Sequence, residues 1–354
     1  MNLVKSKFVE HFNEYISNPS LDPLFMLGDA LLVLSELPDE SIDFVMTSPP
    51  YWGQRQYLNG GIGLEDTLEE YISNLLSIFA EVYRILRPTG SFWLNIGDAY
   101  RNKSLLGIPW IVALRLMDEQ GWTLRNSVIW HKVKGAPDSS KDKLRNVHEY
   151  VFHFTKKSRG YYYNVDAIRS KPRTTRVVNG AVVTATGVTG VRYKRQIELS
   201  TELTDAEKKN ALAALDDMLD RVRKGEISDF RMIIRGQQRT THSNSIRVSG
   251  RARELQKKGF YFLTYHPKGS KPSDVWEIIP EDTQKREFHF APYPEDLCRI
   301  PLLATCPEDG IALDPFCGTG TTNYVAKILG RKSVGIDLCE EYLQYAIVRT
   351  SFLV

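Results

Sequence analysis

Short apolar runs alternate with helical periodicity over the first 50 residues. Leu24–Leu27 and residues 42–46 are apolar runs bounded by Gly, Asp, Ser and Pro, as is typical of buried strands. Residues 30–37 between them predict a brief helix. Pro49 and Pro50 then predict a rigid loop at the end of the second strand, because two consecutive prolines disfavour both helix and central strand.

A long helix is predicted next, because apolar residues recur alternately four and three positions apart. These residues are Leu68, Ile72, Leu75, Phe79, Val82 and Leu86. Asp66 and Glu69 are placed as a capping box at its start. Pro88 and Gly90 are expected to end the helix.

Strands and helices continue to alternate as far as residue 155. We predict a strand over 91–96, a helix over 109–120 closed by Gly121, and two β-rich stretches over 123–130 and 147–155. This alternation indicates an α/β fold with a sheet that is largely parallel.

The same alternation returns after Gly310 as one complete βαβ unit. Ile311–Asp314 is predicted as a strand, residues 315–321 as a glycine-bearing loop, 322–329 as a helix and Lys332–Asp337 as the next strand. The two ends of the chain therefore share one kind of architecture.

Residues 161–280 break this pattern, and we interpret them as an inserted module. Residues 176–195 are rich in Gly, Val and Thr and are expected to be β-rich. Thr204 to Glu207 open a helix that runs to about Lys224, and a basic stretch follows over residues 247–258.

The charge of the chain is unevenly distributed. The total of +3 divides into +9 for residues 161–280, which hold 22 Lys and Arg against 13 Asp and Glu, and −6 for the remainder. Because Lys and Arg displace counterions from a phosphate backbone, a basic module on an acidic body points to a polyanionic partner.

Composition narrows the class of protein further. Of the 354 residues, 42% are hydrophobic, which excludes a disordered chain. No apolar run reaches the roughly 18 residues of a membrane span, and the N-terminal sequence lacks the apolar core of a secretory signal, so we expect a cytoplasmic protein without a membrane partner.

The sequence predicts no metal site. The four cysteines, Cys298, Cys306, Cys317 and Cys339, contain no Cys-x-x-Cys pair, and free thiols are expected. His148 and His153 lie five residues apart in a β-rich stretch, whereas a zinc-protease helix needs histidines four apart.

The loop after the strand Ile311–Asp314 is suited to a nucleoside ligand. Its glycines let the backbone approach a ligand at a helix N-terminus, and Asp337 ends the following strand, 23 residues after Asp314, where a carboxylate suits a ribose diol. The loop has a G-x-G core without the third glycine of G-x-G-x-x-G, so a nucleoside without phosphates, such as S-adenosylmethionine, is better supported than NAD. A tight turn without a ligand is the alternative. The candidate binding residues are Asp314, Pro315, Phe316, Cys317, Gly318, Thr319, Gly320, Thr321, Thr322 and Asp337.

The loop Ser48-Pro49-Pro50-Tyr51 is equipped to hold a planar amine at the carboxyl edge of the sheet. A base whose ring stacks on Tyr51 could have its exocyclic amino group held by Ser48 Oγ and the Pro49 carbonyl. Considered alone, the tetrapeptide is also compatible with an ordinary turn or a proline-rich ligand.

Together, residues 47–52 and 314–322 resemble the DNA amino-methyltransferases that act on cytosine N4 or adenine N6, in the permuted arrangement called the β class. In that class the catalytic loop precedes the cofactor loop, and the target-recognition region lies between them. Further segments that look like the family are Gly28-Asp29-Ala30, residues 91–98, 130–132 with 146–150, and 289–294. Only residues 161–280 lack recognisable family motifs, as is expected of a variable reader.

The resemblance implies a fold and a division of labour. The fold is α/β, with a doubly wound, mostly parallel Rossmann-like sheet in circularly permuted motif order. Residues 1–160 form the catalytic half, 161–280 an inserted DNA target-recognition module, and 281–354 the cofactor-binding half of the same catalytic domain. Asp29 joins the cofactor-binding residues, and Asp29, Asp314 and Asp337 are expected to face a cationic cofactor.

The resemblance also implies a reaction. The target nucleotide is flipped out of duplex DNA and its amine attacks the methyl group of S-adenosylmethionine directly, without a covalent enzyme intermediate. Ser48, Pro49, Pro50 and Tyr51 are the catalytic residues. A Ser at the first position of the tetrapeptide is associated in this family mainly with cytosine N4, and an Asp mainly with adenine N6, so Ser48 favours cytosine.

The implied setting is a restriction system, in which the chain is the modification enzyme. Its partners are double-stranded DNA and a cognate endonuclease that acts on the same site without direct contact, and the chain is a monomer or a homodimer. The candidate DNA contacts are Arg247, Arg251, Arg253, Lys257 and Lys258.

Three alternatives stay open at this point. The same machinery could methylate adenine N6, or the chain could be a non-catalytic DNA-binding protein of the same fold. An NAD-linked oxidoreductase is disfavoured by the missing third glycine and by the basic insert. A carbon-5 cytosine methyltransferase would need a Cys nucleophile, usually after Pro, and no Pro-Cys pair exists.

Overall fold

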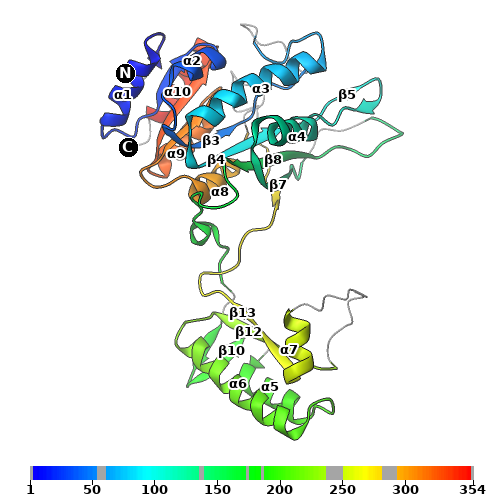
Figure 1. Cartoon of the computed structure of the whole chain (residues 1–354). Coiled ribbons are helices and arrows are strands. Elements are labelled where there is room, and N and C mark those ends of the chain that lie inside the picture. Colours follow the sequence, from blue (N-terminus) through cyan, green and yellow to red (C-terminus); the bar gives the residue numbers. More distant parts are fainter. Residues whose placement is uncertain are drawn as a thin grey trace. The chain divides into compact units, whose positions relative to one another are not determined.

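The structure, a computed structural model, describes most of the chain, which forms two compact units (Figure 1). The first unit comprises Met1–Ala167 and Ser273–Val354, and the second comprises Ile168–Pro272. The described residues are 3–53, 61–134, 139–172, 175–184, 187–236, 250–280 and 293–351.

A nine-stranded sheet forms the centre of the first unit. Its order is β1 (Leu3–Val4), β2 (Leu24–Leu27), β16 (Lys332–Asp337), β15 (Ile311–Asp314), β3 (Ile42–Thr47), β4 (Leu86–Ile96), β8 (His148–Thr155), β7 (Thr123–His131) and β14 (Val275–Glu277). All neighbouring strands are parallel except β8, which is antiparallel to both β4 and β7. The prediction of a mostly parallel α/β sheet is confirmed.

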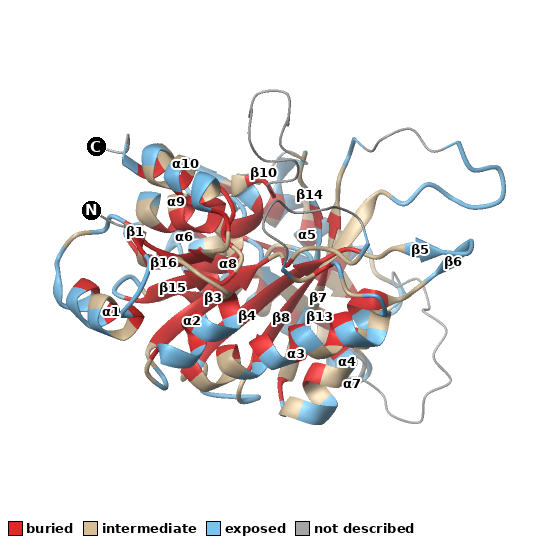
Figure 2. Cartoon of the chain, turned by 90° about the horizontal axis from the view of Figure 1, so that it is seen from above, coloured by how far each residue is buried: buried red, intermediate tan, exposed pale blue. Residues whose placement is uncertain are grey.

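Helices cover both faces of this sheet. One apolar core includes side chains of α1 (Phe8–Ser17), α2 (Ala30–Glu36), α3 (Leu68–Ile85) and α4 (Ile108–Gln120), and a second includes side chains of α8 (Glu295–Thr305) and α9 (Thr321–Ile328). The last helix, α10 (Glu340–Ser351), packs on α9 and β2. Central strands such as β3 are buried along their whole length, as strands covered on both faces must be, and they are red in Figure 2.

The long helix α3 differs from its prediction at both ends. Its capping box is formed by Thr67 and Glu70 instead of Asp66 and Glu69, because the helix begins at Leu68 and its third residue is therefore Glu70. Leu86 does not end the helix but begins β4, which runs through Pro88 and Gly90. At Gly90 an added Cβ would lie 2.8 Å from the Asp43 carbonyl oxygen, so this strand needs glycine where it passes β3.

The second unit has a small core of its own. A three-stranded antiparallel sheet contains β9 (Arg176–Val178), β10 (Ala181–Thr184) and β11 (Gly187–Val188), and a hairpin pairs β12 (Asp229–Ile234) with β13 (Phe260–Tyr265). The helices are α5 (Thr189–Glu198), α6 (Asp205–Arg223) and α7 (Gly250–Lys258). Buried side chains from α5, α6 and the hairpin form one apolar cluster.

Two sequence predictions about this region need correction. Residues 176–195 are β-structure only as far as Val188, because Tyr193 and Ile197, four residues apart, place a helical face in the core. The predicted module, 161–280, also extends beyond the unit on both sides, since Tyr162 and Asn164 donate backbone hydrogen bonds to Thr89 and Ala304, and β14 joins the large sheet. Within its observed bounds the unit has 22 Lys and Arg against 10 Asp and Glu, a net charge of +12.

No described helix is long and apolar enough to cross a membrane. The described residues also contain no group of three or more His, Cys, Asp or Glu side chains that could hold a metal ion. All four cysteines are buried free thiols.

Candidate functional site

The candidate residues meet at one edge of the large sheet. Asp29 follows β2, Asp337 ends β16, Asp314 ends β15, and Ser48 follows β3, and these four strands are consecutive, parallel neighbours in the order β2, β16, β15, β3. Because parallel strands present their carboxyl ends at the same edge, the two loops that are far apart in sequence lie next to each other.

One hydrogen bond joins the two loops directly. Thr47, the last residue of β3, donates its hydroxyl hydrogen to Asp314 Oδ1 over 2.7 Å, across a sequence separation of 267 residues. Both side chains are buried. The loop of residues 48–51 and the loop of residues 315–321 are therefore fixed relative to each other.

The Asp314 carboxylate lies in the protein interior and does not face a ligand. Besides Thr47, it accepts hydrogen bonds from the Phe316 backbone (3.1 Å), the Tyr293 hydroxyl (2.8 Å) and the Thr322 hydroxyl (2.8 Å). It is 1% exposed. Burial raises the pKa of Asp314, while the hydroxyl donors oppose that rise. The expectation that Asp314 faces a cationic cofactor is thus corrected: its four donors make it the anchor that shapes the loop.

Tyr293 completes this buried cluster from the segment just before α8. Its hydroxyl donates to Asp314 and also makes a hydrogen bond with the Thr322 hydroxyl. Burial and the nearby Asp314 charge raise the pKa of Tyr293 well above 10, so it stays a neutral donor. The sequence placed Tyr293 in a family-like segment without giving it a role, and residues 289–292 of that segment lie outside the described residues.

The glycine-bearing loop has the geometry expected of a nucleoside cradle. Gly318 and Gly320 have φ values of 50° and 72°, in the left-handed region that glycine adopts without strain. The Gly318 amide donates to Asp337 Oδ2 (2.9 Å) and the Cys339 amide donates to Oδ1 (2.8 Å). These two bonds orient the carboxylate, and burial raises the pKa of Asp337 to about 6.

The exposed parts of this loop fit an adenosine group. Asp337, Phe316 and Asp29 are each partly exposed, on three neighbouring strand ends. Thr319 Oγ1 is buried without a hydrogen-bond partner among the described residues. Buried polar atoms are normally hydrogen-bonded, so a bound ligand is a candidate partner for this hydroxyl. Asp29 also caps α2 by accepting from the Leu32 amide (3.2 Å). A ribose diol and a sulfonium cation suit these groups. Cys317 is buried and forms part of the packing.

The second loop carries a network of polar side chains around Tyr51. The Tyr51 hydroxyl donates a hydrogen bond to Glu149 Oε2 (2.7 Å) and accepts one from the Ser48 hydroxyl (3.3 Å). Asn95 Nδ2, which has two hydrogens to donate, lies within hydrogen-bond distance of Ser48 Oγ (3.1 Å), the Tyr51 hydroxyl (2.9 Å) and Glu149 Oε2 (2.9 Å). The predicted catalytic tetrapeptide, Ser48 to Tyr51, is therefore held by β4 and β8 as well as by its own strand.

The backbone packing of this loop is equally specific. A Cβ added at Gly97 would lie 2.7 Å from Tyr51 Cε2, so only glycine leaves room for the ring there. Tyr71 donates a hydrogen bond to the Pro50 carbonyl (2.9 Å), whereas no described group donates to the Pro49 carbonyl. Burial, and next the charge of Glu149, raise the pKa of Tyr51 well above 10.

Three residues of this network had no assigned role in the sequence. Asn95, Lys132 and Glu149 lie in segments that look like the family, but no spacing rule connects them with Ser48. The antiparallel strand β8 brings Glu149 to the carboxyl edge of β4, and Lys132, just after β7, forms an ion pair with it. Lys132 also lies 4.9 Å from the ring centroid of Trp130.

A pocket of about 700 Å³ lies beside the catalytic loop. Its wall includes Trp52, Glu65, Asp98 and Arg101. The Trp52 indole donates to the Glu65 carbonyl (2.9 Å), and the Arg101 guanidinium lies 5.4 Å from the ring centroid of Trp52. The wall of the pocket is thus fixed to the loop that bears Tyr51.

The predicted DNA contacts belong to the second unit. Arg251, Arg253, Lys257 and Lys258 are exposed on α7, and Arg247 lies outside the described residues. Lys258 pairs with Glu254 at 3.0 Å. The structure brings the four described residues together on one short helix.

A nucleoside cradle joined at adjacent strand ends to a loop that can hold a planar amine defines a class of protein, the amino-methyltransferases. The family model described as DNA methylase matches residues 42–348, and the chain belongs to this family. The sequence-based recognition is confirmed. Membership in this family confirms the predictions of DNA methylation as the activity and of S-adenosylmethionine as the cofactor.

Individual relatives match over nearly the full chain. The type II methyltransferase M.SfiI of Streptomyces fimbriatus is 34% identical, covering 92% of this chain and 90% of its own. M.SmaI of Serratia marcescens is 28% identical, covering 91% and 88%. Among solved structures, PvuII DNA methyltransferase (cytosine-N4-specific) has a TM-score of 0.55 at 18% identity, covering 94% and 87%, which shows the shared fold. A DNA modification methylase of Thermus thermophilus, in complex with S-adenosyl-L-methionine, has a TM-score of 0.51 at 20% identity, covering 93% and 95%.

Proposed function

We propose that the chain methylates the exocyclic N4 amine of a flipped cytosine within a short duplex sequence, as the modification enzyme of a restriction system. The observation that carries the reaction is the Thr47–Asp314 hydrogen bond, which fixes the acceptor loop beside the cofactor loop. Ser48 at the first position of the tetrapeptide supports cytosine. The naming of full-length relatives as type II methyltransferases supports the restriction setting, in which a nuclease recognises the same sequence.

S-adenosylmethionine is held in this proposal by the loop of residues 314–322 and by the carboxylates at the neighbouring strand ends. Asp337 would accept hydrogen bonds from the ribose diol, Asp29 and Phe316 would border the adenosine, and Thr319 Oγ1 would gain the partner that it lacks among the described residues. When bound, the cofactor supplies an electrophilic methyl group on a sulfonium. Asp314, with its four donors, keeps the loop in shape and does not contact the ligand.

The acceptor side is formed by Ser48, Pro49 and Tyr51. The Pro49 carbonyl, to which no described group donates, and Ser48 Oγ accept the two amino hydrogens and direct the nitrogen lone pair away from them. The Tyr51 ring stacks on the base, and its hydroxyl bonds to Glu149 and Asn95 keep the ring in one orientation. In this proposal the target base and the cofactor bind at adjacent strand ends. The amine and the methyl group are therefore already in position to react, and no separate collision between them is needed.

The proton released after transfer has a short route. The methylated amine is more acidic than the free amine, so a weak acceptor is sufficient. Ser48 Oγ, the Tyr51 hydroxyl and the Glu149 carboxylate form a chain of hydrogen bonds of 3.3 Å and 2.7 Å from the amine toward Lys132. Neutral Tyr51 passes a proton along this chain by accepting one and donating another.

The second unit, net charge +12, is the proposed target reader. Neutralisation of phosphates by Lys and Arg provides affinity that is independent of sequence, and base contacts then provide specificity. The first unit, Met1–Ala167 and Ser273–Val354, supplies the chemistry in this proposal. A monomer or a homodimer can perform it.

Sequencing that detects modified bases in DNA from a host expressing the chain tests the proposal. We expect N4-methylcytosine at nearly every copy of one short sequence. Modified adenines in its place would assign the same machinery to adenine N6. Unmodified DNA, together with specific DNA binding by the purified protein, would show a non-catalytic DNA-binding protein of the same fold.

A further inference from the structure

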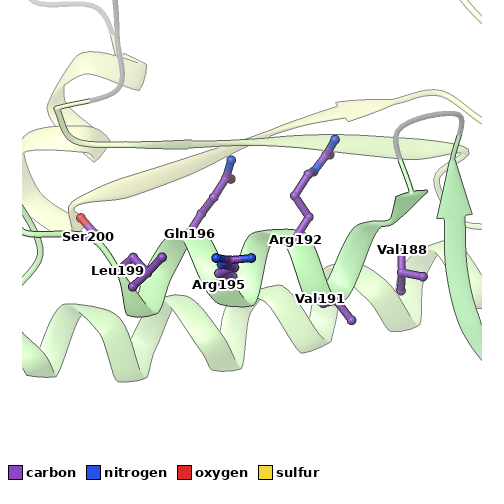
Figure 3. Close-up of a pocket in the computed structure, with 7 residues that line it drawn as sticks. All are labelled: Val188, Val191, Arg192, Arg195, Gln196, Leu199 and Ser200. Atoms are coloured by element: carbon purple, nitrogen blue, oxygen red, sulfur yellow. The ribbon is translucent and has the colours of Figure 1, made fainter.

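Helix α5 of the second unit presents a broad exposed face of basic and aliphatic side chains. Tyr193 and Ile197 are buried on its inner side, and Arg195 lies at the middle of the opposite, exposed arc. Lys194 and Arg195 are exposed, and Arg192 and Gln196 are partly exposed. Figure 3 shows Arg192 and Gln196 extending from the helix on the same side, with Arg195 projecting from the turn between them.

The aliphatic residues of this face are unusually open to solvent. Val191 is 66% exposed and Leu199 is 69% exposed, and both line a pocket of about 690 Å³ together with Arg192, Arg195 and Gln196. Exposure of aliphatic side chains of this size to water is energetically unfavourable. They indicate a partner surface that offers both negative charge and apolar groups.

Lys194 and Arg195 of α5 differ from four other basic residues of the same unit, each of which pairs with an acidic side chain. Arg221 pairs with Glu226, Arg223 with Asp220, Arg235 with Glu207 and Lys258 with Glu254. Within the part of the chain that the structure describes, no acidic side chain forms an ion pair with Arg195 or Lys194. These two charges are available to an external anion.

The exposed surface of the neighbouring helix α6 has the opposite charge. Its exposed positions include Asp205, Asp216, Asp217 and Asp220, and only Lys209 and Arg223 are exposed basic residues of this helix. An acidic face repels a phosphate backbone, so charge complementarity selects α5 over α6 as the DNA-facing helix.

The side chains of α5 match the chemistry of the major groove. Arg forms paired hydrogen bonds with guanine, Gln with adenine, and aliphatic groups contact the thymine methyl. A major groove admits one α-helix, and the ten residues of α5 are enough to cross it. Arg195, Gln196 and Val191 supply one side chain of each kind on one exposed face.

We propose that α5 is the base-reading helix of this methyltransferase, that it enters the major groove of duplex DNA, and that Arg195 and Gln196 contact base edges. This inference rests on the proposed function and specifies the surface that gives it sequence specificity. It adds a reader to the phosphate contacts expected from α7.

Duplex selection tests the reader independently of methyl transfer. The full-length wild-type protein, Arg195→Ala, Gln196→Ala and the control Lys209→Ala are each used to select duplexes from a randomised pool, and the selected sequences are compared. We expect wild type and Lys209→Ala to select one short motif. Arg195→Ala should lose preference at one or two positions, with binding to the wild-type motif weakened roughly tenfold or more.

Methylation in an expressing host provides the second readout, by sequencing of modified bases. Arg195→Ala should modify a relaxed set of sites, whereas Lys209→Ala should modify the wild-type set. The inference is overturned if Arg195→Ala selects and modifies the wild-type motif unchanged. It is also overturned if that variant weakens binding equally for all sequences and lowers the salt dependence by about one charge, since this shows a phosphate contact, or if it alters only the oligomeric state in sedimentation.

Thermal unfolding of each variant separates misfolding from lost reading. Gln196→Ala provides the second probe, because its partly exposed side chain carries no charge and should change preference at a different position. If wild type selects a motif but transfers no methyl group, the proposed function fails while the reader stands. If wild type methylates DNA and both α5 variants keep its motif, the reader fails while the proposed function stands.

Discussion

Tyr51 is the residue through which β4 and β8 contact the loop that we propose as the acceptor side of the site. Its hydroxyl contacts Glu149 and Asn95, and its ring lies against Gly97. Stacking of a base on an aromatic ring contributes about 1–3 kcal/mol. Hydrogen bonds to charged groups contribute about 1.5–3 kcal/mol. Mutation to Phe, which keeps the ring, and to Ala, which removes it, can therefore separate the contribution of the ring from that of the hydroxyl.

We predict that Tyr51→Ala lowers kcat by roughly a hundredfold or more, and that Tyr51→Phe lowers it by about tenfold, because Phe keeps the stacking surface and loses the orienting bonds. Single-turnover methyl transfer measures both. Tyr163→Phe, at a half-exposed position of the same unit, is the matched control and should be neutral. Full activity of Tyr51→Ala would contradict the stacking role.

We predict that binding of S-adenosylmethionine depends on pH through Asp337. Because burial raises its pKa to about 6, the carboxylate is charged above pH 6 and becomes protonated below it. We expect the KM for S-adenosylmethionine to rise as the pH falls from about 8 to about 5, with a smaller change in kcat, since a protonated acid is a weaker acceptor for a ribose diol. Asp337→Asn should have a high KM that is independent of pH. A flat KM for wild type would refute the ribose contact.

Thr47 offers a test of the junction between the two loops. Thr47→Val keeps the shape and removes the hydrogen bond to Asp314, which leaves a buried carboxylate with one donor fewer. We predict a loss of about 1–3 kcal/mol in the free energy of unfolding and a lower kcat. Thr47→Ser retains the hydroxyl and should restore most of both. Denaturant unfolding and methyl-transfer assays on the two variants measure the effect, and equal behaviour of Val and Ser would contradict it.

Strand β8 is the element that the sequence explained least. Its existence followed from its β-rich composition, and both of its histidines lie on the strand, as predicted. Its antiparallel direction did not follow, because nothing local distinguishes a strand that runs with its neighbours from one that runs against them. That direction is what brings Glu149 to Tyr51, so the network of Asn95, Glu149 and Lys132 was beyond sequence reasoning.

A buried histidine on the same strand predicts that the stability of the fold depends on pH. His153 is buried, stacks on Trp93 at 4.2 Å and bonds to Ser91, and burial lowers its pKa to about 3. The unfolded chain protonates this residue near pH 6.5, so its stabilising contribution is complete above about pH 6.5 and is lost as the pH falls toward 3. Asp337, whose pKa is raised, acts in the opposite sense, so a variant is needed to isolate His153.

Between about pH 7.5 and about pH 5, we expect protonation of His153 in the unfolded chain to lower the free energy of unfolding of the wild type by about 2 kcal/mol. His153→Phe should lack this decrease. Urea unfolding at the two pH values measures this difference. A wild-type and variant pair with the same pH dependence would show that His153 is not buried in its neutral form.

At the scale of the whole molecule, the sequence predicted the sheet type, the motif order and a separate basic segment. Periodicity and glycine stops identified α4 and the βαβ unit of β15, α9 and β16 with only small shifts of their ends. The limits of the second unit were less accurate, because a short strand such as β14 has too few residues to show which sheet it joins. The buried position of Asp314 also depends on tertiary contacts with Thr47, Tyr293 and Thr322.

Mass spectrometry of nucleosides from DNA treated with the purified full-length protein and S-adenosylmethionine examines the reaction itself. We expect N4-methylcytosine in the digest, dependent on the cofactor and lost with Tyr51→Ala. N6-methyladenine alone would contradict the assignment of the base. DNA with neither modified nucleoside would contradict the account of the two joined loops as one methyl-transfer site.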